Sequence, residues 1–212
     1  YIPLLIKPNR DVLAQGATGS GKTLLYLAAA IHFASTLVTL KGPLVIIIAH
    51  SRELALQIFQ SACIYTQFTN VSVALHRGVG ENSQDAARYL TNEKKNTRPG
   101  QEHIIIATPG RLYELLNSEK NIRLSSNLSI SRLDSRLVGL LIIDEAHDGI
   151  ETTRTDGAFE MIKRTNTLHL SGTPFKALAN EKFEKDAIFN WTYLDEQNIK
   201  QIELNEGESG DH

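Results

Sequence analysis

The sequence predicts an α/β domain built on a mainly parallel β-sheet with helices on both faces. Short apolar runs alternate along the 212 residues with longer segments of helical period. The apolar runs are rich in Val, Ile and Leu and show little polar alternation, which is typical of strands buried on both sides. The length suits one large domain, and a hydrophobic content of 42% is ordinary for a globular protein with a packed core.

Six strands and six helices are predicted along the chain. The strands are Asp11–Ala14, Leu44–Ala49, Val71–Leu75, His103–Ala107, Val138–Asp144 and Thr167–Leu170. The helices are Lys22–Leu40, Arg52–Phe68, Gln84–Asn96, Gly110–Asn117, Gly157–Arg164 and Pro174–Phe183. Such alternation predicts right-handed βα units, whose ligands bind beyond the carboxyl ends of the strands.

Two polar stretches, Asn92–Gly100 and Ser118–Arg136, are predicted to be surface loops. Their basic residues would either contact nucleic acid or simply be solvated. Residues 1–196 are expected to form the domain, and residues 197–212 a C-terminal segment that ends in a disordered acidic tail.

Charge and cysteine content restrict the class of protein. A net charge of −2 and a pI near 6.4 argue against a uniformly basic nucleic-acid coat protein, although they allow a local basic groove. The single cysteine, Cys63, excludes an internal disulfide and favours a reducing cytoplasmic or nuclear location. The longest apolar runs are too short to span a bilayer, so no membrane partner is expected. Because the chain begins at Tyr1 rather than Met, we expect a fragment or a processed chain.

A glycine-rich segment between the first predicted strand and helix has the P-loop pattern. Its residues, all assigned to nucleotide binding, are Gly16, Ala17, Thr18, Gly19, Ser20, Gly21, Lys22 and Thr23. The glycines let backbone N–H groups turn toward phosphate oxygens, and the helix N-terminus adds its dipole. Lys22 is expected to reach the β- and γ-phosphates of ATP, and the Thr23 hydroxyl to ligate Mg²⁺.

Two further strand ends carry polar residues. Asp144 and Glu145 follow a buried strand: Asp144 is expected to hold Mg²⁺, and Glu145 to orient and deprotonate the attacking water. An acidic pair stabilised by a helix dipole is the alternative. Beyond the last predicted strand, the hydroxyls of Ser171 and Thr173 are expected to bond His147 or Glu145 and to sense the γ-phosphate, although Ser-Gly-Thr-Pro also suits a plain turn.

These three motifs, in this order, resemble those of superfamily 2 helicases and translocases, and the resemblance extends to about Glu196. Ser51-Arg52-Glu53-Leu54-Ala55, the glycine at position 78 and Thr108-Pro109-Gly110-Arg111 are similar to blocks of DEAD-box RNA helicases. The resemblance implies a RecA-like P-loop domain with ATP-dependent helicase activity. It also implies contacts with a single-stranded RNA or DNA backbone by Arg52, Gly78, Thr108, Gly110 and Arg111. The alternatives are that Arg52 and Glu53 merely pair with neighbouring residues on a helix, and that Arg111 is a solvated helix residue.

The sequence departs from the DEAD-box pattern in several places. His147 replaces an aspartate, Gly172 replaces an alanine, and His50-Ser51 replaces Pro-Thr. The stretches 144–150, 168–178 and 190–196 look more like motor subunits of restriction enzymes. A chimera, a redesigned sequence or a divergent phage-type protein would each explain this mixture.

The resemblance also implies parts that the 212 residues do not encode. In the family, a glutamine before the P-loop reads adenine, and a second RecA-like domain supplies arginine fingers. Without that domain, we expect the chain to bind ATP and hydrolyse it slowly. Three functions stay open at this point: an RNA helicase, a DNA-translocating ATPase of a restriction or repair complex, and a non-catalytic binding module.

Overall fold

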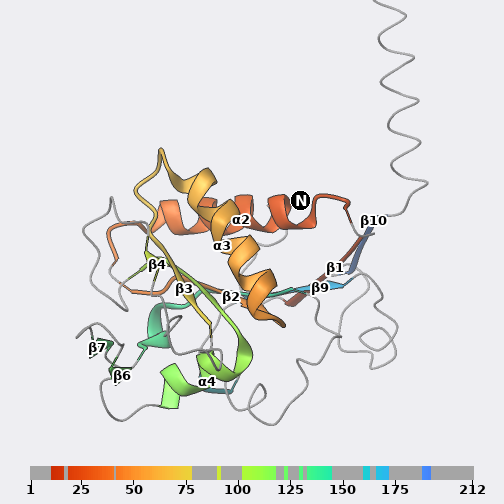
Figure 1. Ribbon diagram of the computed structural model, residues 1–212. Helices are drawn as coiled ribbons and strands as arrows, with labels where there is room; N and C mark the ends of the chain where they lie inside the picture. Colours follow the sequence, from red (N-terminus) through yellow and green to blue (C-terminus); the bar gives the residue numbers. More distant parts are fainter. Residues whose placement is uncertain are drawn as a thin grey trace, which may run out of the picture.

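The computed structural model describes residues 11–16, 19–40, 42–77, 90–91, 102–117, 122–123, 129–130, 133–144, 160–162, 166–171 and 188–191. Within them, eight strands form one sheet in the order β10-β1-β9-β8-β2-β5-β3-β4 (Figure 1). The strands are β1 Asp11–Gly16, β2 Val45–Ala49, β3 Val73–His76, β4 Leu90–Thr91, β5 Ile104–Ala107, β8 Leu140–Asp144, β9 Asn166–Ser171 and β10 Ile188–Trp191. All neighbours pair in parallel except β3 and β4, which confirms the predicted parallel architecture.

Helices cover both faces of this sheet, as predicted. Helices α2 (Lys22–Thr36) and α3 (Arg52–Thr66) pack on one face, and α4 (Pro109–Asn117) packs on the other (Figure 1). Side chains alternate along β2, so that Val45 and Ile47 face α2 and α3 while Ile46 and Ile48 face α4. Because both faces of β2 are buried, its sequence is apolar throughout and does not alternate with polar residues.

The parallel pairing brings the carboxyl ends of the strands to one edge of the sheet. Ala49 of β2 pairs with Asp144 of β8, and Gln15 of β1 pairs with Ser171 of β9. Farther along the sheet, His76 of β3 pairs with Ala107 of β5. Every motif predicted to bind nucleotide or nucleic acid follows one of these strand ends, so the described ones lie along the same edge.

One predicted helix is wrong where the structure describes it, and one predicted loop contains two short strands. Leu90 and Thr91, predicted to be helical within Gln84–Asn96, instead form β4, which pairs with Leu75 and Ala74 of β3. Pairing at a sheet edge here overrides the local helical pattern. The stretch Ser118–Arg136, predicted to be a surface loop, contains the short strands β6 (Ile122–Arg123) and β7 (Ser129–Ile130), which form a small antiparallel sheet.

Several boundaries also differ from the prediction. Helix α2 ends at Thr36, before the predicted Leu40, because the next residue leaves the helical conformation. Helix α3 ends at Thr66, whose hydroxyl donates to the carbonyl of Ala62 at 2.8 Å. Within Gly157–Arg164, residues 160 and 161 are helical and residue 162 is not.

A short 3₁₀ turn, η2 (Ser135–Leu137), begins inside the predicted loop, and β10 was not predicted at all. The predicted helix Pro174–Phe183, the domain boundary at residue 196 and the acidic tail lie outside the described residues. Among the described helices, none has the length and apolar character that crossing a bilayer requires.

Candidate nucleotide and nucleic-acid sites

The turn between β1 and α2 has a backbone that glycine favours. Gly19 and Gly21 have φ values of 84° and 80°, in the left-handed region where other residues are strained. At Gly16 a Cβ atom would lie 2.8 Å from the Ser20 hydroxyl oxygen, so a larger residue there would require the Ser20 side chain to move. The glycines of the predicted P-loop therefore serve a tight turn that leads directly into the helix.

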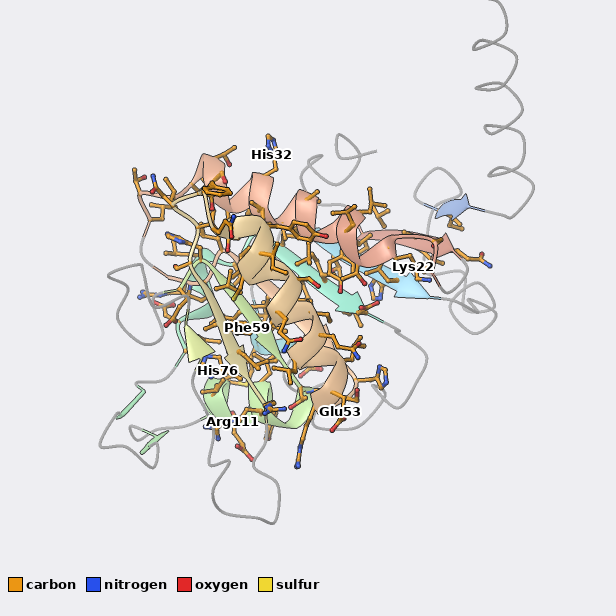
Figure 2. The ribbon with its side chains drawn as sticks, turned by 45° about the horizontal axis from the view of Figure 1, so that its top comes forward. Lys22, His32, Glu53, Phe59, His76 and Arg111 are labelled. Atoms are coloured by element: carbon orange, nitrogen blue, oxygen red, sulfur yellow. The ribbon has the colours of Figure 1, made fainter. Side chains whose placement is uncertain are left out.

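The N-terminus of α2 is built to face an anion. No side chain caps it, and its first turn contains no acidic residue. Its leading N–H groups and the positive end of its dipole therefore point toward the turn. Lys22, the first helical residue, donates from Nζ to the carbonyl oxygen of Gly16 at 2.6 Å, which holds the ammonium beside the loop (Figure 2). Backbone donors and an ammonium around one turn suit phosphate oxygens.

Asp144 lies at the end of β8 and is 4% exposed. Its Oδ2 atom accepts a hydrogen bond from the hydroxyl of Tyr26 at 2.9 Å. Tyr26 is fully buried on α2, one helical turn beyond Lys22. Thr23 precedes Tyr26 by three residues and so occupies the same face of the helix. The bond thus ties the helix that follows the P-loop to the strand that carries the acidic motif.

The pair Thr23 and Asp144 fits a magnesium ion bound together with nucleotide. No cluster of three or more His, Cys, Asp or Glu side chains able to hold a metal occurs among the described residues. Mg²⁺ does not need such a cage, because it keeps several waters and uses one or two carboxylates together with substrate phosphates. A hydroxyl on the first turn of α2 and a buried carboxylate bonded to that helix are the oxygen ligands such a site requires.

The remaining predicted catalytic residues are only partly described. Ser171 is the last residue of β9 and lies opposite Gln15 of β1, one residue before the P-loop begins. Glu145, His147 and Thr173 lie outside the described residues, as do Ala17, Thr18 and Gly78. Their roles therefore stay predictions from the sequence.

The residues predicted to bind nucleic acid follow the neighbouring strands β2 and β5. Ser51 caps α3, because its hydroxyl accepts from the backbone N–H of Leu54 at 3.1 Å, and the exposed Arg52 follows at the first helical position. After β5, the carbonyl of Thr108 accepts from Leu112 N at 2.9 Å, which starts α4. Gly110, in the first turn of α4, is partly exposed and offers backbone to a ligand.

Arg111 is held more firmly than a solvated helix residue would be. Its side chain is 11% exposed and forms an ion pair with Glu114 at 2.7 Å, the latter being 57% exposed. The alternative of a solvated Arg111 is therefore wrong. Glu114 was not among the predicted site residues, although its position three residues after Arg111 on a helix is a known signal for such a pair.

His76 lies beneath this surface at the end of β3. It is 4% exposed, and its carbonyl accepts from the backbone N–H of Thr108 at 3.2 Å. Burial, and secondarily the charge of Arg111, lower the pKa of His76 from 6.5 to about 3. At neutral pH the imidazole is therefore uncharged and does not repel Arg111 beside it (Figure 2).

This buried imidazole predicts acid sensitivity. Between pH 6.5 and about 3 the unfolded chain protonates His76 and the folded chain does not, so the free energy of unfolding falls as pH decreases through this window. Above pH 6.5 the contribution is constant. Replacing His76 by Gln should flatten this decline, as measured by urea unfolding from pH 4 to pH 8. An equal decline in both proteins would show that other groups cause it.

The order of strands in the sheet separates the residues predicted to bind nucleotide from those predicted to bind nucleic acid. Ser171 and Asp144 end β9 and β8, and the P-loop begins at the end of β1. Arg52 and Thr108 come after β2 and β5, and His76 ends β3. The two groups meet where Ala49 pairs with Asp144. Figure 2 shows Lys22 on one side of the domain. His76 and Arg111 lie near each other on the other side.

A parallel sheet with a glycine-rich turn before α2 and a buried acid ending β8 defines a P-loop nucleotide-binding domain. A family model described as DEAD/DEAH box helicase matches residues 1–180, so the chain belongs to that family. It is 32% identical over 185 residues to the ATP-dependent RNA helicase HAS1 of Candida albicans, which covers 86% of this chain and 29% of that protein. It is 34% identical over 119 residues to the DEAD-box ATP-dependent RNA helicase CshC of Bacillus cereus, covering 56% of this chain and 28% of that one.

Solved structures support the fold. S. cerevisiae Dbp5 bound to RNA and ADP BeF3 superposes with a TM-score of 0.66 at 17% identity, covering 92% of this chain and 44% of that chain. A hypothetical ATP-dependent RNA helicase from Sulfolobus tokodaii superposes with a TM-score of 0.57 at 20% identity, covering 90% and 50%. The predicted RecA-like fold is thereby confirmed. The chain spans less than a third of the length of the two curated relatives above.

Proposed function

We propose that the chain is the ATP-binding motor domain of an ATP-dependent RNA helicase. The observation that carries this proposal is the placement of a P-loop turn and a family-specific Thr-Pro-Gly-Arg block on one edge of one parallel sheet. ATP is the expected nucleotide, since Dbp5, a structural neighbour, is bound to ADP BeF3 together with RNA. Catalysis is expected inside the cell, where ATP is available.

In the nucleotide site, the backbone N–H groups at the start of α2 and the ammonium of Lys22 would bind the β- and γ-phosphates. Thr23 and Asp144 would hold Mg²⁺, which supplies charge neutralisation on the phosphates. Glu145 would accept the proton of the attacking water, and Ser171, Thr173 and His147 would respond to the γ-phosphate.

In the nucleic-acid site, one strand of RNA would lie across the ends of β2, β5 and β3. The exposed Arg52 and Arg111, which is ion-paired with Glu114, would supply positive charge to the phosphates. Thr108 offers a hydroxyl, and Gly110 and Gly78 offer backbone N–H groups without a bulky side chain. These contacts are to the backbone, so they predict little preference for base sequence.

A second RecA-like domain is part of this proposal. ATP and RNA would each contact both domains, so that binding of either favours the closed arrangement. Arginine fingers from that domain are worth on the order of 10³-fold or more in turnover. Turnover by the 212-residue chain should therefore be slow.

Two other functions remain as alternatives. A DNA-translocating ATPase is favoured by residues in the last third of the chain, most of which lie outside the described residues, whereas the two relatives above are named RNA helicases. A non-catalytic module would show no change in ATP turnover on Glu145→Gln, because it would have none. The nucleotide-binding geometry around Lys22 and Asp144 gives no support to that reading.

Fluorescence anisotropy tests the proposal. Labelled single-stranded RNA and double-stranded DNA would each be titrated with the chain, with and without a non-hydrolysable ATP analogue and Mg²⁺. Tighter binding of RNA, strengthened by the analogue, is the expected result. Preferential binding of DNA would overturn the assignment to RNA and favour the translocase.

The ion pair of Arg111 predicts a gain in RNA affinity. Glu114→Gln removes a negative charge beside the proposed phosphate contact, so RNA should bind a few-fold more tightly at low salt, with a smaller gain at high salt. Asp134→Asn is the matched control. Asp134 is also an exposed acid paired with an arginine, Arg136, but this pair lies before the amino end of β8 and not in the helix that follows β5. Equal effects of the two substitutions would show that only net charge matters.

A further inference from the structure

We propose that Tyr26 is a positioning residue that orients Asp144 toward the magnesium ion of the nucleotide. This inference rests on the proposed function of the P-loop and extends it to a residue outside the motifs. The hydroxyl of Tyr26 donates to Oδ2 of Asp144 at 2.9 Å, between residues 118 positions apart in the chain. Both side chains are buried, at 0% and 4% exposure.

The bond constrains the carboxylate in two ways. It engages one of the two carboxylate oxygens, which limits rotation of the group at the end of β8. It also sets the position of α2 relative to β8. Because Thr23 lies on the same helix one turn before Tyr26, the bond fixes the two expected oxygen ligands of Mg²⁺ relative to each other.

The chemistry of a phenol suits this role. A lysine or arginine at this position would bring a positive charge beside the expected cation, whereas a phenol donates one hydrogen bond and brings no charge. Groups that orient a metal-binding carboxylate in this manner influence affinity for the metal strongly, typically 10- to 100-fold.

A simpler role is that Asp144 merely satisfies a buried hydroxyl. The two roles differ in what they predict for Tyr26→Phe, which removes the hydroxyl and keeps the ring. A structural role predicts lower stability with unchanged dependence of nucleotide binding on Mg²⁺. A positioning role predicts a change in that dependence.

The experiment measures the affinity of the chain for fluorescently labelled ADP in EDTA and during a titration with Mg²⁺. For Tyr26→Phe we expect unchanged affinity in EDTA and a rise on the order of tenfold in the Mg²⁺ concentration for half-maximal effect. Tyr65→Phe is the matched control, since it removes a hydroxyl from an exposed tyrosine on α3. An unchanged Mg²⁺ dependence in Tyr26→Phe would overturn the proposal.

A double-mutant cycle identifies the route of the effect. If Tyr26 acts through Asp144, the effects of Tyr26→Phe and Asp144→Asn on the Mg²⁺ midpoint should be far from additive. Additive effects would contradict the proposal. Should Tyr26→Phe be unstable, the rise in Tm produced by Mg²⁺ and ADP over ADP in EDTA gives the same comparison, and a rise equal to that of the wild type would overturn it. Failure of the wild type to bind ADP in EDTA would instead count against the P-loop assignment.

Discussion

Replacing Lys22 by Ala is expected to lower the affinity for ATP about a hundredfold or more, because it removes a charge-assisted contact with the β- and γ-phosphates. The geometry supports this expectation, since Nζ already lies 2.6 Å from the carbonyl of Gly16 at the start of the loop. The measurement is the dissociation constant for a fluorescent ATP analogue in EDTA, so that phosphate binding is separated from Mg²⁺.

Arg136→Ala is the control for this substitution. Arg136 is a basic residue whose side chain is 83% exposed, and it lies within η2, before the amino end of β8. It should leave nucleotide affinity unchanged. Unchanged affinity in Lys22→Ala would mean that Lys22 does not contact the phosphates, and the P-loop assignment would fail.

Most of the central sheet could be predicted from the sequence, for a physical reason. Strands such as β2 and β8 are buried on both faces, and that burial requires the apolar runs that reveal them. β4 and β10 could not be predicted, because they are the two outermost strands of the sheet and each pairs with a neighbour on one side only. Leu90 and Thr91 in particular carry no local signal that outweighs the helical pattern around them.

In the candidate site, too, local features could be predicted from the sequence and contacts between distant segments could not. Gly16, Gly19, Gly21 and Lys22 could be assigned from spacing alone, because the turn and the helix that follows are local structures. The bond between Tyr26 and Asp144 could not, since it joins two motifs through the packing of α2 on β8. Only the spacing of four residues from Lys22 hinted that Tyr26 lies on the same helical face.

Replacing Asp144 by Asn is expected to weaken the contribution of Mg²⁺ to nucleotide binding while leaving binding in EDTA intact. The amide keeps the size of the side chain and an oxygen that can accept from the Tyr26 hydroxyl, so the packing of α2 on β8 should survive. What is lost is the negative charge that holds the cation, and the Mg²⁺ midpoint should rise on the order of a hundredfold. ATP turnover should fall with it.

The two substitutions distinguish the phosphate-binding part of the nucleotide site from the part that binds Mg²⁺. Lys22→Ala should weaken binding with and without Mg²⁺, whereas Asp144→Asn should weaken it only with Mg²⁺ present. Asp11→Asn is the control, because Asp11 is an exposed acid at the amino end of β1, on the edge of the sheet away from the loop. If Asp144→Asn retained a normal Mg²⁺ midpoint, the buried carboxylate would be a structural partner of Tyr26 alone. The cation would then have to be held without it.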